Sequence, residues 1–164
     1  RFFPAVRRGR ARVTLAATLR PPAARAGTIL AFDFGTRRIG VAVGETTLGL
    51  AHPLATIAAD NEDDRLAAIA KLVGEWRPAL LVVGLPTHAD GTPHAMTARA
   101  QRFARRLEAR FHLAVEQVDE RYTTEAATVA LAGAGVGQRG HKLLSDQVAA
   151  QIILQAYLDQ RAHA

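Results

Sequence analysis

Short apolar runs and amphipathic segments alternate along most of this chain. Thr28 to Phe34 is a continuous apolar run interrupted by a single acid, which is typical of a strand covered on both faces of a sheet. The turn-forming pair Gly35-Thr36 follows, and residues 39–43 and 48–57 have the composition of two further strands. This part of the sequence predicts a three-stranded antiparallel meander.

Helices and strands alternate in the rest of the chain. An apolar stripe predicts a helix over residues 65–76, which Pro78 ends. Further strands are predicted at 80–83 and 114–118, further helices at 96–111, 123–131 and 144–161, and a glycine-rich loop at 133–140. This order predicts an α/β fold in which helices cover both faces of a mixed five-stranded sheet.

Positive charge is concentrated at the start of the sequence. The formal net charge is +6, and residues 1–27 contain seven arginines and no acid, so the remaining 14 basic and 15 acidic side chains nearly cancel. These first residues show no helical or strand periodicity. We therefore expect a disordered basic extension at 1–27 and a single domain at 28–164. A phosphate-binding arm, a transit-like segment and sequence upstream of a true start are alternative interpretations of the extension.

The location of the protein is constrained by what the sequence lacks. No apolar run approaches the roughly 20 residues that a membrane-spanning helix needs, and no segment has the pattern of a secretory signal. Cysteine is absent, which excludes disulfides and thiolate metal sites. We expect a cytoplasmic protein with no membrane partner.

Three acidic positions are unusual for the elements in which they lie. Asp33 interrupts the apolar first strand, where an uncompensated carboxylate would cost several kcal/mol of desolvation. Asp146 shares a helix face with apolar residues three, four, seven and eleven positions later, so it points toward the core. Glu120 and Asp119 both follow the strand at 114–118, and position alone does not choose between them.

Carboxylates from these positions can converge only if their charge is neutralised, because like charges at short range raise one another's pKa. Two divalent ions about 3.5–4 Å apart would do this and would activate water for phosphodiester cleavage. Ligands that are all oxygen favour Mg²⁺ or Mn²⁺. The structural alternatives are that Asp33 pairs with Arg37 or Arg38, and that Asp146 stabilises the start of its helix.

Four segments of the sequence resemble, in order, the successive motifs of the YqgF/RuvX family of Holliday junction resolvase-like, rRNA-processing nucleases. They are Asp33 to Ala42, Gly84-Leu85-Pro86 with Asp90-Gly91, Asp119 to Thr124, and Lys142 to Asp146 followed by Ala149-Ala150. The resemblance extends from about Thr28 to Asp159 and implies an RNase H-like fold. It also implies that Asp33, Glu120 and Asp146 are the metal-binding catalytic acids, which favours Glu120 over Asp119.

The same resemblance implies a metal-dependent nuclease that matures the 5′ end of 16S ribosomal RNA, with Mg²⁺ or Mn²⁺ in a two-metal site. Nucleic acid is the expected partner, in the form of precursor rRNA and, by analogy with junction resolution, branched DNA. A resolvase that acts on a four-way junction would need a symmetric homodimer. The arginine-rich extension departs from the compact pattern of the family.

Several basic residues lie beside the three acids or in the glycine-rich loop. Arg38, Arg121 and Lys142 neighbour the acids in sequence, and Arg139 lies in the loop, so we expect these four side chains to hold substrate phosphates. Salt bridges to the acids and ordinary surface flexibility are the alternatives. A transition-metal site at His88, Asp90 and His94 is not expected, because their loop has no regular spacing that would bring them together.

Two other functions fit parts of this pattern. Asp33 to Thr36 also resembles the first phosphate loop of actin-, Hsp70- and sugar kinase-type ATP-binding modules, but those proteins hold nucleotide between two related domains and this chain has one copy of the motif. A non-catalytic nucleic-acid or ribosome-associated protein could use the basic extension while the acids stay structural. Metal-dependent cleavage would separate this second alternative from a nuclease.

Overall fold

A mixed six-stranded sheet forms the centre of the computed structural model, which describes residues 11–15, 27–86, 95–120 and 138–162, with side chains in the last range described from Asp146 onward. The strands are β1 (Arg12–Leu15), β2 (Thr28–Phe34), β3 (Arg38–Glu45), β4 (Leu50–Ala58), β5 (Leu80–Leu85) and β6 (Val115–Asp119). The helices are α1 (Glu62–Trp76), α2 (Thr97–Phe111) and α4 (Gln138–Ala162). The expected mixed α/β architecture is confirmed.

The strand order in the sheet is β1-β4-β3-β2-β5-β6. The pairs β1·β4, β4·β3 and β3·β2 are antiparallel, whereas the pairs β2·β5 and β5·β6 are parallel. Because parallel strands end at the same edge of a sheet, the residues that follow β2, β5 and β6 lie along one edge. Asp33, near the end of β2, and Glu120, directly after β6, both lie at this edge.

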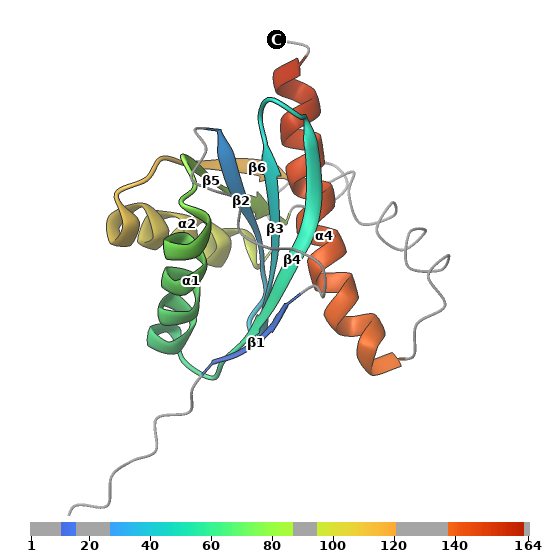
Figure 1. Cartoon of the computed structure of the whole chain (residues 1–164). Helices are drawn as coiled ribbons and strands as arrows, with labels where there is room; N and C mark the ends of the chain where they lie inside the picture. Colours follow the sequence, from blue (N-terminus) through green and yellow to red (C-terminus); the bar gives the residue numbers. More distant parts are fainter. Residues whose placement is uncertain (1–10, 16–26, 87–94, 121–137, 163–164) are drawn as a thin grey trace, which may run out of the picture.

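Helices cover both faces of the sheet, with α1 and α2 on one side and α4 on the other (Figure 1). Phe32 of β2 is fully buried with Leu107 of α2, while Ala31 is fully buried with Ile153 of α4. Side chains alternate between the two faces along a strand, so Asp33 has the parity of Ala31 and faces the α4 side. The acid therefore lies between the sheet and the last helix.

A short strand within the basic extension was not expected from the sequence. Residues 12–15 form β1, which pairs antiparallel with β4 and makes the sheet six-stranded rather than five-stranded. All four side chains of β1 are exposed, and its four residues are too short a run to stand out as a strand in the sequence. The strand depends on pairing with the edge of β4. The boundary between extension and domain at residue 28 stays a prediction.

The last helix also begins earlier than expected. Gln138 to Gly140 are helical, although we predicted a loop through 133–140 and a helix from 144. A glycine costs about 1 kcal/mol relative to alanine inside a helix, which a long packed helix can absorb. The helix predicted at 123–131 falls outside the described residues. None of the described helices is both long and apolar enough to cross a membrane.

Candidate active site

Asp33 is the partly buried acid near the end of β2. It pairs in register with Gly40 of β3, so its place in the sheet is fixed by the central antiparallel ladder. Burial raises the pKa of Asp33; a hydrogen bond with Glu120 opposes this shift, and the negative charge of Asp146 adds to it. The acid that interrupts the first apolar strand thus interacts with both other predicted acids.

Glu120 follows β6 directly, and its amide donates to the carbonyl of Leu85 at 2.9 Å, which holds it beside the end of β5. Burial raises the pKa of Glu120 to about 9, and the charge of Asp33, the hydrogen bond with Asp33 and the charge of Asp119 act in the same direction. At neutral pH Glu120 therefore keeps its proton in the metal-free protein. The proton is shared with Asp33 through the hydrogen bond between the two carboxyl groups.

Gly84 of β5 makes room for the Glu120 carboxyl. A Cβ atom at this position would overlap Oε1 of Glu120 and Cδ1 of Ile153. The glycine of the second family-like motif is therefore explained by close approach of an acid side chain rather than by a special backbone angle.

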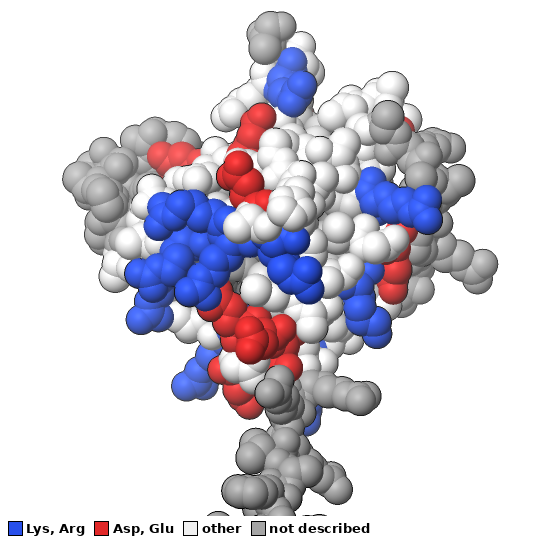
Figure 2. All heavy atoms as spheres, turned by 90° about the vertical axis from the view of Figure 1, so that its left-hand side faces the viewer, with Lys and Arg blue, Asp and Glu red and all other residues white. Residues whose placement is uncertain are grey.

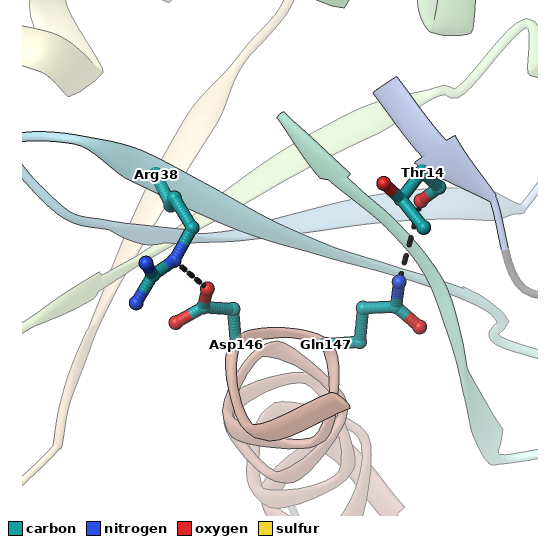
Figure 3. Close-up of polar contacts among 4 residues, drawn as sticks. All are labelled: Thr14, Arg38, Asp146 and Gln147. Carbon is teal, nitrogen blue, oxygen red and sulfur yellow. Dashed lines mark hydrogen bonds and ion pairs between the residues drawn. The ribbon is translucent and has the colours of Figure 1, made fainter. Parts of the chain in front are cut away.

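Asp146 comes from α4, on the face of that helix that packs against the sheet. The Nε atom of Arg38 donates to Oδ2 of Asp146 at 2.6 Å, and both side chains are partly buried (Figure 3). The neighbouring Gln147 is almost fully buried and donates to the carbonyl of Thr14 in β1 at 3.3 Å (Figure 3). This part of α4 is thus attached both to β3 and to the strand of the extension.

The backbone of α4 lies close against β3 at Gly40, where a Cβ would overlap the carbonyl of Asp146. Gly40→Ala should lower the free energy of unfolding by about 1–3 kcal/mol or more, because the helix must move away to relieve the overlap. Gly74→Ala is the control, since that site in α1 faces open space and should gain about 0.5–1 kcal/mol. Urea unfolding measures both changes, and equal stability of the two variants would contradict the described contact between α4 and β3.

The three predicted acids come together at one edge of the sheet, but as two pairs. Asp33 bonds with Glu120, and Asp146 bonds with Arg38. With the side chains in these positions, no three Asp, Glu, His or Cys residues in the described ranges converge closely enough to hold one metal ion. The donor set still suits a hard cation, because it consists of carboxyl oxygens that repel one another when ionised, and such oxygens are the ligands that Mg²⁺ binds.

The four residues predicted to bind substrate phosphates are described by the structure to different extents. Arg38 pairs with Asp146, which is the salt-bridge alternative considered for it. Arg121 lies outside the described residues, as does the loop with His88, Asp90 and His94. The backbone at Arg139, expected in the glycine-rich loop, and at Lys142 is helical. Their side chains lie outside the described part, so their role in phosphate binding stays a prediction.

Arg65 of α1 is a structural contributor to this edge that the sequence analysis missed. Its guanidinium is buried and donates to the carbonyl of Gly35 at 2.8 Å and to the carbonyls of Thr36 and Ala59. These bonds hold the turn that directly follows Asp33 and Phe34. The signal was present in the sequence, because Arg65 lies three, four and seven positions before the buried residues of its helix, where an apolar side chain is the norm.

A family model described as RuvX, Holliday junction resolvase, matches residues 27–160, which is most of the chain. The chain belongs to the RuvX family. The match begins after β1, so the strand of the extension lies outside the part of the chain that the family model matches.

Relatives in this family are similar over most of their own length. A protein of Nitrosospira multiformis named "Putative pre-16S rRNA nuclease" is 57% identical over 136 residues, which is 83% of this chain and 90% of that protein. A protein of Neisseria gonorrhoeae with the same name is 54% identical over 133 residues, covering 81% of this chain and 88% of the relative. The RuvX assignment therefore rests on whole-domain similarity rather than on one motif.

Solved structures show the same fold at low sequence identity. Thermus RuvC, described as T. thermophilus RuvC in complex with a Holliday junction substrate, superposes with a TM-score of 0.52 at 16% identity, covering 83% of this chain and 96% of that one. A fowlpox virus resolvase superposes with a TM-score of 0.55 at 9% identity, covering 82% and 98%. The fold is that of the RuvC-like, RNase H-like resolvases.

Proposed function

We propose that this RuvX-family chain hydrolyses phosphodiester bonds of precursor 16S ribosomal RNA, with Asp33, Glu120 and Asp146 as its catalytic, metal-binding acids. Family membership makes the chain a nuclease, that is, a hydrolase acting on ester bonds of nucleic acid. The relatives' names support the choice of rRNA as substrate. Maturation of the RNA 5′ end and a cytoplasmic location are parts of the same proposal.

The observation that carries the proposal is the convergence of the Asp33 and Glu120 carboxyl groups at the edge of the sheet, with Asp146 close enough to act on Asp33. Burial raises the pKa of Glu120 to about 9, so ionising this carboxyl group in the metal-free protein costs free energy. The charge of the neighbouring Asp119 adds to this cost. A purely structural site would more simply use apolar or amide side chains. Acids held in this state are suited to receive cationic charge when the site is in use.

Mg²⁺ or Mn²⁺ bound by these oxygens would supply an activated water and stabilise the leaving oxygen of the scissile phosphodiester. The chain's own residues prepare for this in two ways. With such an ion bound, Glu120 would release its proton to solvent, so that its carboxylate could serve as a ligand together with that of Asp33. Arg38, once separated from Asp146, lies beside the same edge with its guanidinium available to a phosphate oxygen.

A nuclease panel tests the function. The substrates are single-stranded RNA with a 16S 5′ flank, duplex RNA and a four-way DNA junction, each with Mg²⁺, Mn²⁺ or EDTA. We expect metal-dependent cleavage of the precursor RNA and none with EDTA. Binding of the RNA without cleavage in either metal would favour the non-catalytic alternative, and cleavage of the junction alone would indicate a resolvase acting as a dimer.

A further inference from the structure

A second concentration of charge lies on the opposite face of the sheet from the acids. Helix α2 carries five exposed arginines and a single acid, Glu108. Figure 2 shows a large patch of Lys and Arg side chains, bordered by acidic side chains, on the side of the molecule that α1 and α2 cover. The arginines of α2 are Arg99, Arg102, Arg105, Arg106 and Arg110. The nuclease chemistry proposed above lies on the α4 side of the sheet and uses none of these arginines.

Three of these arginines line a pocket of about 290 Å³ between α2 and the start of α1. Arg99, Arg102 and Arg106 follow the spacing i, i+3, i+7, which puts them on one stripe of the helix. The remaining two, Arg105 and Arg110, do not line the pocket. The helix itself is held firmly, because residues between these arginines, such as Phe103 and Leu107, are buried against the sheet.

The charges around the pocket are only partly neutralised. Arg106 forms an ion pair with Glu62, and the buried Arg65 donates to backbone carbonyls. Across the portion of the chain that the structure describes, neither Arg99 nor Arg102 has a carboxylate within ion-pair distance, although Asp60 also lines the pocket. Two guanidinium groups therefore face a hollow with their donors available.

The pocket reaches the same edge of the sheet as the acids. Phe34 lines the pocket and packs on Phe103 with ring centroids 4.9 Å apart, while Asp33, the preceding residue of β2, faces the α4 side. Consecutive Cα atoms are about 3.8 Å apart, so the two sites are back to back across one strand end. A strand of nucleic acid that crosses this edge would meet the acids on one side and the arginines on the other.

We propose that Arg99 and Arg102 form a subsite that binds a backbone phosphate of the nucleic-acid substrate away from the bond that is cut. The proposal rests on the proposed nuclease function. The planar guanidinium fork matches two phosphate oxygens, and phosphate contacts fix the position of a strand without reading its sequence. A rigid helix that presents two such forks beside the catalytic edge would set where the strand lies over the acids.

The test compares two double variants that lose the same charge from the same helix. Arg99→Ala/Arg102→Ala removes the subsite, and the control Arg105→Ala/Arg110→Ala removes two exposed arginines that do not line the pocket. Fluorescence anisotropy of a labelled 16S-precursor RNA in EDTA, at several salt concentrations, gives Kd for each protein. We expect the subsite variant to raise Kd at least about fivefold and to lower the salt slope by about one to two, because fewer counterions are released.

The control should keep Kd within about twofold of the parent and lose little of the salt slope. Equal effects of the two double variants would overturn the subsite, because RNA affinity would then depend on the total positive charge of α2 and not on Arg99 and Arg102 in particular. A subsite variant that binds like the parent would overturn it as well. The nuclease panel on the parent protein keeps the two proposals apart, since metal-dependent cleavage there upholds the function even when the subsite fails.

Discussion

Asp33→Asn, Glu120→Gln and Asp146→Asn should each slow metal-dependent cleavage by at least about 10²-fold. Each change removes one negative charge from the set of oxygens proposed to hold the divalent ions, and so weakens stabilisation of the charge that develops in the transition state. Rates of RNA cleavage at saturating Mg²⁺ or Mn²⁺ measure the effect. Binding of the RNA should survive, because phosphate contacts come from other residues.

Asp119→Asn is the matched control for these variants. Asp119 is the sequence neighbour of Glu120, but its side chain is exposed at the end of β6, whereas Glu120 is partly buried and bonded to Asp33. The control should retain cleavage within a few-fold of the parent. An equal loss of cleavage in Asp119→Asn would contradict the assignment of Glu120, rather than Asp119, as the catalytic acid that follows β6.

The metal-free parent should become less stable as the pH rises from about 5 toward 9, and Glu120→Gln should remove most of this dependence. The pKa of Glu120 is raised to about 9 in the folded protein, against 4.5 for an ordinary glutamate, so the folded state binds the proton more tightly than the unfolded state. Its contribution to stability is complete below the unfolded pKa and is lost as the pH rises through the folded one. The raised pKa of Asp33 acts in the same direction.

Thermal unfolding in EDTA across this pH range measures the effect. Asp119→Asn is the control: it removes only the smallest of the contributions that raise the pKa of Glu120, so it should keep most of the parent's slope. Saturating Mg²⁺ should reverse the trend, because a cation that binds the ionised pair stabilises the folded state most where the proton is lost. A flat profile for the parent, or a steeper one for Glu120→Gln, would contradict the shared proton at this site.

The central strands were predictable because burial on both faces leaves a clear apolar signal. Strand β2 has the expected bounds, and β3 and β4 differ from their predicted bounds by only one or two residues. Strand β1 was not predictable, since its side chains are exposed and its existence depends on pairing with β4. The early start of α4 was hidden by Gly140, because glycine is a poor helix former and favours a loop locally.

The site was predictable to different degrees for each acid. Asp33 stands out as a lone acid in an apolar strand, and Asp146 as an acid on an inward helix face. Glu120 needed the family resemblance, because only the folded structure shows which of two consecutive acids turns toward Asp33. The ion pair between Arg38 and Asp146 joins residues 108 positions apart and could not be chosen over phosphate binding from sequence alone.

The most direct test combines two measurements on the same preparations of Asp33→Asn, Glu120→Gln and Asp146→Asn: metal-free melting temperature and single-turnover cleavage of the precursor RNA with Mg²⁺. If the acids form a catalytic site, the two variants of the buried pair should melt at or above the temperature of the parent, because each replaces a buried ionisable carboxyl group with a neutral amide. All three variants should lose cleavage. Acids that serve only as structural partners would give the reverse, since removing one member of a buried ion pair costs about 3–5 kcal/mol. Destabilised variants with intact cleavage would therefore contradict the assignment of Asp33, Glu120 and Asp146 as the catalytic acids.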